Sequence, residues 1–252
     1  MNIIVQKYGG SILNSKQDIK KVGDNIIGSV KQGNTVVAVV SALKGETDEL
    51  LEFASDINKN PDFRELDMLI STGEQKTGAL LSLYLQGNHL PAISMTGHQI
   101  GIITDSEYTN ANILKINSDR LEKELATGKV LIVAGFQGVN QLEEITTLGR
   151  GGSDLTAIAL AITLKADFVE FYKDTGRIYT VNPSFGKGKP INKIDYTSLM
   201  ELSKGDVRII SPKAIELAKK YNITMIIKSI SEKGKTLVIN EDFTLAEDRF
   251  LA

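Results

Sequence analysis

The chain contains no cysteine among its 252 residues. Disulfide bonds, zinc sites built on thiolates and cysteine nucleophiles are therefore excluded. Histidine is almost as scarce, because only His89 and His98 occur. A metal site built from several histidines is not expected from so few imidazole ligands.

The chain also lacks a strong net charge and long apolar runs. Its formal net charge is −2, which offers no electrostatic basis for binding nucleic acid or an anionic membrane surface. No apolar run approaches the roughly 18 residues that a membrane-spanning helix needs. The N-terminal residues enter an apolar run at Ile3 without the basic region and apolar core of a secretion signal. We therefore expect a cytoplasmic protein.

What the chain does contain is an alternation of apolar runs with helical patterns, in a composition that is 42% hydrophobic. The predicted strands are 3–7, 35–40, 91–95, 130–134, 168–172, 223–227 and 236–239, with an extended segment at 177–180. The predicted helices are 19–30, 46–57, 66–85, 119–126, 154–165, 194–203 and 212–221. Small hairpins are expected in 96–117, a glycine-flanked turn at 135–138 and a loop at 184–193. This order favours a mainly parallel sheet covered by helices on both faces.

The segment 147–154 is the most informative part of the chain, and it reads Thr-Leu-Gly-Arg-Gly-Gly-Ser-Asp. Its glycines allow a close approach of the backbone to a ligand, and the helix that follows offers unpaired N–H groups at its positive end. Ser153 or Asp154 is predicted to cap that helix. Arg150 adds a planar cation that can donate two parallel hydrogen bonds to a carboxylate. The segment therefore predicts an anion site.

Glycines and polar residues also follow four of the predicted strands. They are residues 9–11 after strand 3–7, residues 41–47 after strand 35–40, Gly135 after strand 130–134, and residues 173–174 after strand 168–172. Ligands of parallel sheets bind at the carboxyl ends of the strands. We therefore expect these segments to build one site.

These segments, in this order, resemble the catalytic domain of the aspartate kinases in the amino-acid kinase family. The matching segments are 7–11, 40–42, 71–75, 135–138, 147–154 and 172–183, so the resemblance extends over about residues 2–240. Neither a Walker A loop nor a Gly-x-Gly-x-x-Gly fingerprint occurs. The resemblance implies an α/β fold, a three-layer αβα sandwich around a mainly parallel sheet. It also implies a catalytic domain at 1–240, followed by a tail at 241–252.

The resemblance implies transfer of the γ-phosphoryl group of ATP to the side-chain carboxylate of L-aspartate, which yields 4-phospho-L-aspartate. That reaction opens the biosynthesis of lysine, threonine and methionine. The resemblance further implies Mg²⁺ held mainly through the phosphates, no nucleic-acid or membrane partner, and a homodimer. A carboxylate nucleophile needs no general base, and phosphoryl transfer depends on positioning and charge stabilisation, so the shortage of histidine suits this reaction.

The same resemblance assigns the catalytic and acceptor residues. Lys7 would bridge the transferring phosphoryl group, and Asp154 would organise that lysine and meet Mg²⁺ through water. Glu74 would lie near the ammonium group of the amino acid, and Arg150 would pair with its carboxylate. The other residues assigned to the acceptor are Ser41, Thr47, Gly151, Gly152 and Ser153.

The nucleotide side is assigned to Lys7, Gly9, Gly10, Ser11, Lys173, Asp174, Tyr179, Ser184 and Arg208. This part of the chain departs from the family pattern, because Gly176 stands where an Asp is usual and Arg177 where a Gly is usual. Asn182 and Ser184 likewise replace an Asp and an Arg, and His98 replaces a Trp on the acceptor side. Two alternatives stay open: a related kinase with another amino-acid or carboxylate acceptor, and a non-catalytic paralogue that binds a full-length kinase.

Family members commonly continue into a pair of small regulatory ACT domains. This sequence ends soon after the predicted strand at 236–239. From this chain we therefore expect no feedback control through such domains.

Overall fold

The computed structural model describes residues 2–180, 188–203 and 209–240. Eight strands form its central sheet: β1 (Ile3–Tyr8), β2 (Thr35–Val40), β3 (Ala92–Met95), β6 (Val130–Ala134), β9 (Phe168–Tyr172), β12 (Lys193–Ile194), β13 (Met225–Lys228) and β14 (Lys235–Val238). Their order across the sheet is β12-β14-β13-β9-β1-β2-β6-β3. Every neighbouring pair is parallel except β13 with β14, which confirms the predicted mainly parallel sheet.

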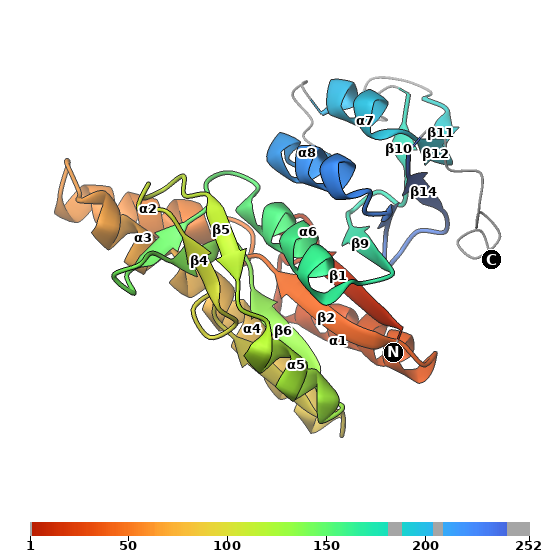
Figure 1. Ribbon diagram of the computed structural model, residues 1–252, viewed down its shortest axis with the longest axis horizontal. Coiled ribbons are helices and arrows are strands. Elements are labelled where there is room, and N and C mark those ends of the chain that lie inside the picture. The colour runs from red at the N-terminus through yellow and green to blue at the C-terminus, as the bar shows by residue number, and fades with distance from the viewer. Residues whose placement is uncertain (1, 181–187, 204–208, 241–252) are drawn as a thin grey trace.

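The described helices are α1 (Lys16–Lys31), α2 (Glu46–Ile57), α3 (Phe63–Ile70), α4 (Thr72–Gly87), α5 (Asp119–Ala126), α6 (Gly152–Leu164), α7 (Tyr196–Leu202) and α8 (Pro212–Tyr221). Helices α1 and α4 pack on one face of the sheet, and α5, α6, α7 and α8 pack on the other. Figure 1 shows the strands β1 and β2 between α1 and α6. The three-layer αβα sandwich is therefore confirmed.

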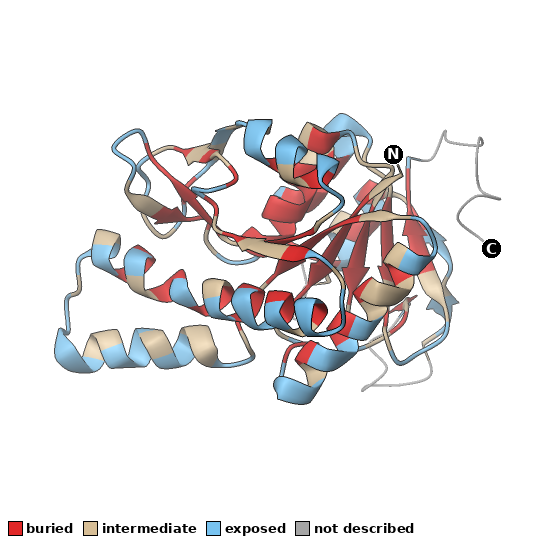
Figure 2. Ribbon diagram, turned by 90° about the horizontal axis from the view of Figure 1, so that it is seen from below, coloured by how far each residue is buried: buried red, intermediate tan, exposed pale blue. Residues whose placement is uncertain are grey.

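Strand β2 shows why the central strands are continuously apolar. Val36, Ala38 and Val40 belong to the core beneath α1 and α4, whereas Val37 and Val39 belong to the core beneath α6. Successive side chains of a strand point to opposite faces, so a strand covered on both sides needs apolar residues at every position. Figure 2 shows this burial concentrated on the strands and on the helix faces that meet them.

The helix predicted at 66–85 is wrong, because the structure divides it into α3 and α4 at Ser71. The Ser71 hydroxyl donates to the carbonyl of Met68 at 3.0 Å, and the Thr72 hydroxyl donates to that of Leu69 at 2.7 Å. Such side chains offer the last carbonyls of a helix an alternative to continuing the ladder. The apolar pattern, which continues through both helices, carries no sign of this break.

A second, four-stranded sheet lies beside the main one, in the order β5-β4-β7-β8. Its strands are β4 (Ile102–Thr104), β5 (Ile113–Ile116), β7 (Gln137–Val139) and β8 (Ile145–Thr147). The antiparallel pair of β4 and β5 confirms the hairpin expected in 96–117. The turn predicted at 135–138 is partly wrong, because β7 already begins at Gln137. Strands of three residues carry too little alternation to be recognised locally.

The loop predicted at 184–193 also contains short strands. Strand β10 (Ile178–Tyr179) pairs with β11 (Pro190–Ile191), and β12 follows directly. Ser211 caps α8, since its side chain accepts from the N–H of Ala214. No helix in the described part of the chain is long and apolar enough to cross a membrane. The predicted tail at 241–252 lies outside the described residues, and the domain extent of 1–240 stays a prediction.

A buried polar row ties β1, β9 and β13 together on the α1 side of the sheet. The Glu170 carboxylate accepts hydrogen bonds from Gln6 at 2.8 Å, Tyr172 at 2.9 Å and Lys228 at 2.8 Å. The ring of Tyr8 stacks on that of Tyr172 with centroids 4.7 Å apart. Neighbouring residues of a strand face opposite ways. The row therefore holds together β1 and β9, whose ends carry candidate functional side chains on the opposite face of the sheet.

Candidate active site

A cavity of about 660 Å³ opens at the carboxyl ends of β1 and β2, against the N-terminus of α6. Helix α2 borders it and contributes Thr47, Asp48 and Leu51, although no residue of α2 is buried. The remaining lining residues are Lys7, Gly10, Ser41, Ala42, Leu43, Lys44, Gly45, Leu66, Ile70, Glu74, Thr109, Phe136, Thr147, Gly149, Arg150, Gly151, Gly152 and Ser153. All the residues assigned to the acceptor therefore meet in one cavity.

Lys7 and Asp154 form a buried ion pair beneath this cavity. The Lys7 Nζ lies 2.7 Å from Asp154 Oδ1, and the two side chains are only 8% and 7% exposed. Asp154 Oδ2 accepts the backbone N–H of Ser211 at 3.1 Å. Burial alone would raise the pKa of Asp154, but the charges of Lys7 and Lys173 and the hydrogen bonds lower it below its ordinary value. Asp154 is thus held ionised and holds the Lys7 ammonium in place.

The cap predicted for α6 is wrong. Its N-cap residue is Gly151, and no side chain accepts a hydrogen bond there. The Asp154 carboxylate is instead engaged by Lys7 and Ser211, which approach from other parts of the fold. The start of α6 is therefore open to the cavity that Gly151, Gly152 and Ser153 line, and its dipole favours an anion there.

Replacing Gly151 with alanine is expected to destabilise the fold more than the same change at Gly45. Both glycines line the cavity as N-caps with φ of 77° and 84°, where a Cβ costs about 1–2 kcal/mol. A Cβ at Gly151 would also lie 2.4 Å from that of Ser211, whereas one at Gly45 would meet nothing within 4 Å. Overpacking adds about 1–3 kcal/mol, which chemical denaturation measures. Equal losses in the two variants would contradict this steric argument.

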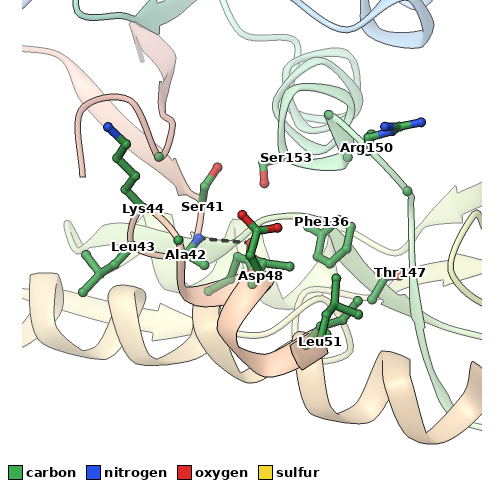
Figure 3. A pocket seen from close by; sticks show the side chains of 18 of the residues that line it. Ser41, Ala42, Leu43, Lys44, Asp48, Leu51, Phe136, Thr147, Arg150 and Ser153 are labelled. Atoms are coloured by element: carbon green, nitrogen blue, oxygen red, sulfur yellow. Dashed lines mark hydrogen bonds between the residues drawn. The ribbon is translucent and has the colours of Figure 1, made fainter. Parts of the chain in front are cut away.

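Glu74, in the first turn of α4, presents an unpaired oxygen to the cavity. Its Oε1 accepts the N–H of Ala42 at 3.0 Å, the bond dashed beside Ala42 in Figure 3. Its Oε2 is buried without a hydrogen-bond partner among the described residues. Burial, and to a smaller extent the charge of Glu46, raise the pKa of Glu74 to about 7, against the opposing pull of its hydrogen bonds and of Lys7. A cationic group of a ligand would satisfy this oxygen.

Arg150 lies at the rim of the cavity with its side chain exposed. Figure 3 shows it on the opposite side of the view from Ser41 and Lys44. In the part of the chain that the structure describes, no hydrogen bond or ion pair engages its guanidinium. Arg150 is therefore free to bind a ligand carboxylate.

Only part of the nucleotide side meets the cavity. Gly10 lines it, and Gly9 lies directly under Lys7, because a Cβ at Gly9 would be 2.8 Å from the ammonium nitrogen. Lys173 is partly buried close to Asp154 and Lys7. Burial lowers its pKa, which Asp154 raises and Lys7 lowers further. A second cation therefore lies near enough to the Lys7–Asp154 pair to interact with it electrostatically.

The other residues assigned to the nucleotide do not line the cavity. Ser11 and Asp174 are exposed, and Tyr179 lies in β10 opposite Pro190. Arg177 donates to Asn192 Oδ1 at 3.3 Å, and its guanidinium occupies the space that a Cβ of Gly234 would fill. The assigned Ser184 and Arg208, like Asn182, lie outside the described residues.

A family model for the amino acid kinase family matches residues 2–229. The chain belongs to the amino acid kinase family. An aspartokinase of Bacillus sp. (strain MGA3) is 42% identical over 249 residues, which are 98% of this chain and 61% of the relative. Aspartokinase 2 of Bacillus subtilis (strain 168) is 41% identical over 98% of this chain and 61% of its own length. The chain thus spans about three-fifths of these curated relatives.

Solved structures agree with the assignment of this chain to the amino acid kinase family. Aspartate kinase from Synechocystis has a TM-score of 0.84 at 42% identity, covering 94% of this chain and 40% of that one. E. coli aspartokinase III, solved with aspartate and ADP, has a TM-score of 0.84 at 23% identity, covering 94% of this chain and 64% of that one. The second likeness shows a shared fold.

Some cavity residues of this amino acid kinase were not recognised in the sequence. Asp48 and Leu51 lie on α2, the helix that begins within the predicted segment 41–47, so their position soon after a buried strand was a usable signal. Thr109 carried no such signal, because it lies in a loop with a positive φ of 66°. Long-range folding alone brings it to the cavity.

The described residues contain no group of three or more His, Asp or Glu side chains that could hold a metal ion. Asp154 is the carboxylate closest to Lys7, and both of its oxygens are engaged by protein donors. Mg²⁺ in proteins often keeps several waters and binds through one or two carboxylates plus substrate phosphates. This donor set fits a metal that arrives with a nucleotide rather than one caged by the protein.

Proposed function

We propose that this chain is an ATP-dependent aspartate kinase, which phosphorylates the side-chain carboxylate of L-aspartate to give 4-phospho-L-aspartate. One observation carries the proposal: a single cavity brings together the Lys7–Asp154 pair, the unpaired oxygen of Glu74 and the unengaged Arg150. These groups match the charges of an amino acid with a second carboxylate. The aspartokinase names of the curated relatives support the same acceptor.

The acceptor would bind through its two backbone charges. Glu74 Oε2 would accept from the ammonium group, and Arg150 would donate to the α-carboxylate with its planar fork. The side-chain carboxylate would then extend toward Lys7 at the end of β1. Holding three charges at once orients the nucleophile, which is the larger part of what phosphoryl transfer requires.

In the transfer itself, an oxygen of the acceptor carboxylate attacks the γ-phosphorus while the bond from that phosphorus to the β,γ-bridging oxygen breaks. ADP leaves with the electron pair, and no proton has to be removed, because the nucleophile is already ionised. Lys7 and the open N-terminus of α6 would stabilise the negative charge that spreads over the phosphoryl oxygens. Asp154 keeps the Lys7 ammonium in position throughout.

Mg²⁺ would be held by the ATP phosphates, with Asp154 reaching it through water because Lys7 and Ser211 already engage its oxygens. When bound, the ion neutralises phosphate charge. We further propose that the protein acts in the cytoplasm at the entry to lysine biosynthesis and forms a homodimer. Size-exclusion chromatography with light scattering tests the oligomeric state.

A coupled ADP-release assay over a panel of amino acids and small carboxylates, with and without Mg²⁺, tests the proposal. We expect ADP release that requires both aspartate and Mg²⁺. Activity with another acid but none with aspartate would establish the related kinase with a different acceptor. Absence of both turnover and calorimetric ATP binding would favour the non-catalytic paralogue.

A further inference from the structure

Asp67, in the middle of α3, is a buried carboxylate that the proposed reaction does not use. Its exposure is 0%. Its Oδ2 accepts the backbone N–H of Thr147 at 2.8 Å and that of Thr109 at 2.9 Å, and its Oδ1 accepts the Thr147 hydroxyl at 2.6 Å. Both threonines line the proposed acceptor cavity. Asp67 thus ties two of its walls to one helix.

A buried carboxylate is costly unless its oxygens are fully engaged. No ion pair is formed by Asp67 within the described ranges, so three hydrogen bonds provide the compensation. Burial raises the pKa of Asp67, while the bonds from Thr147 and Thr109 lower it. Without the carboxylate, the buried N–H of Thr147 and the partly buried N–H of Thr109 would lose this acceptor.

Thr109 shows what this anchor holds in place. Its φ of 66° lies in the left-handed region, which a β-branched residue rarely adopts. Its loop presses on the 147–154 segment, since a Cβ at Gly149 would meet Asn110 Oδ1 at 2.8 Å and the Thr109 carbonyl oxygen at 3.2 Å. The N–H of Ala111 also donates to the carbonyl of Thr147 at 2.8 Å. The loop that carries Thr109 and the 147–154 segment are therefore held against each other, and Asp67 bonds to both.

Arg150 depends on this arrangement because no hydrogen bond or ion pair from the described residues holds its guanidinium. Its place is determined by the backbone on either side. On the N-terminal side Asp67 holds Thr147, and on the C-terminal side Asp154 holds the start of α6 through Lys7 and Ser211. Two buried carboxylates thus fix the segment that carries the acceptor-binding cation.

We propose that Asp67 is a positioning residue for the acceptor: by anchoring Thr147 and Thr109, it holds Arg150 where the acceptor carboxylate binds. The inference rests on the proposed function, since it concerns the acceptor of the same site. Asp67 touches neither substrate, so its effect is on the KM of the acceptor.

The test compares Asp67→Ala with Asp67→Asn. The alanine variant loses all three hydrogen bonds, and we expect the KM for aspartate to rise about tenfold or more, because small misplacements of binding groups are costly. The KM for ATP and the kcat should change less than about threefold. Asparagine can accept both N–H groups with its carbonyl and donate to the Thr147 hydroxyl, so it should restore the KM to within about threefold of the wild type.

Asp195→Ala is the matched control. Asp195 also accepts two backbone N–H groups, from Thr197 at 2.8 Å and Ser198 at 2.9 Å, but it caps α7 and does not line the cavity. The Asp195→Ala variant should lose stability without the selective change in the KM for aspartate. Parallel increases in both KM values for Asp67→Ala, or the same selective change in Asp195→Ala, would overturn the proposal.

Two further measurements keep the test decisive. Thr147→Val removes only the hydroxyl bond, so it should fold and raise the same KM to a smaller extent even if Asp67→Ala does not fold; an unchanged KM would contradict the anchor. Amide hydrogen exchange at Thr147 and Thr109 should be slow in the wild type and in Asp67→Asn, and faster in Thr147→Val. Wild-type enzyme without aspartate turnover would overturn the proposed function, whereas unchanged exchange would overturn the role of Asp67 separately.

Discussion

Asp154→Ala is expected to lower kcat by about 10²- to 10³-fold, the usual effect of removing one element of charge stabilisation at a transition state. Asp154 holds the Lys7 ammonium at 2.7 Å, and without it the cation has no fixed position beneath the cavity. The acceptor is proposed to bind through Glu74 and Arg150 instead. The KM for aspartate should therefore change far less than kcat, as steady-state ADP release measures.

Loss of a buried ion pair also weakens the fold, by about 3–5 kcal/mol when one partner is removed. Glu170→Ala provides a control, because the buried Glu170 pairs with the partly exposed Lys228 at 2.8 Å on the opposite face of the sheet. That variant should lose stability and keep its kcat. If both variants lost kcat in proportion to stability, the proposed role of Asp154 would be wrong.

Glu74→Gln is expected to raise the KM for aspartate about 10- to 100-fold at pH 8, the range for losing a hydrogen bond between charged groups. The pKa of Glu74 is about 7, so its carboxylate is ionised at pH 8 and becomes protonated as the pH falls. A protonated carboxyl attracts an ammonium group much less. The wild-type KM should thus rise as the pH falls below about 7, and the variant should lack this dependence. A wild-type KM that stays flat between pH 6 and 8 would contradict the assignment.

The raised pKa of Glu74 also affects stability. Ionisation of Glu74 favours binding of the acceptor but disfavours the folded state. The ordinary pKa of a glutamate is 4.5, so between pH 4.5 and about 7 unfolding releases the Glu74 proton, and stability falls as the pH rises. Above pH 7 the ionised group costs the fold about 3 kcal/mol. Glu74→Gln should therefore be more stable than the wild type at pH 8 and equal to it near pH 4, as denaturant unfolding measures. A residue whose ionised form improves ligand binding but weakens the fold is distinguished in this way from a residue that only stabilises the structure.

The helix and strand order followed from local patterns at the positions where burial is continuous. Strand β2 and helices α2, α5 and α8 have the predicted bounds, because their apolar spacing and end residues are local properties. The predictions failed where side-chain hydrogen bonds or pairing with another strand decide where an element begins or ends. Ser71 and Thr72 end α3 through hydroxyl bonds that the apolar spacing does not reveal, and β7 forms by pairing with β8 and with the distant β4.

The candidate site likewise has features that the sequence could predict and features that it could not. The chemical types at the strand ends, from Lys7 to Arg150, could be identified in the sequence because parallel strands bring their carboxyl ends to one edge. The cap expected from Asp154 could not be judged locally, since its partners Lys7 and Ser211 are distant in the chain.

The sequence by itself determined the αβα fold, the residue types around the predicted anion site and the absence of cysteine chemistry. Each of these depends on composition or on spacing along the chain. Only the tertiary structure decided how the 147–154 segment is anchored, with Asp67 bonded to Thr147 across 80 residues and Asp154 turned from the helix end toward Lys7. A buried carboxylate takes whichever donors the fold delivers, and the fold delivers them from elements that no local pattern connects.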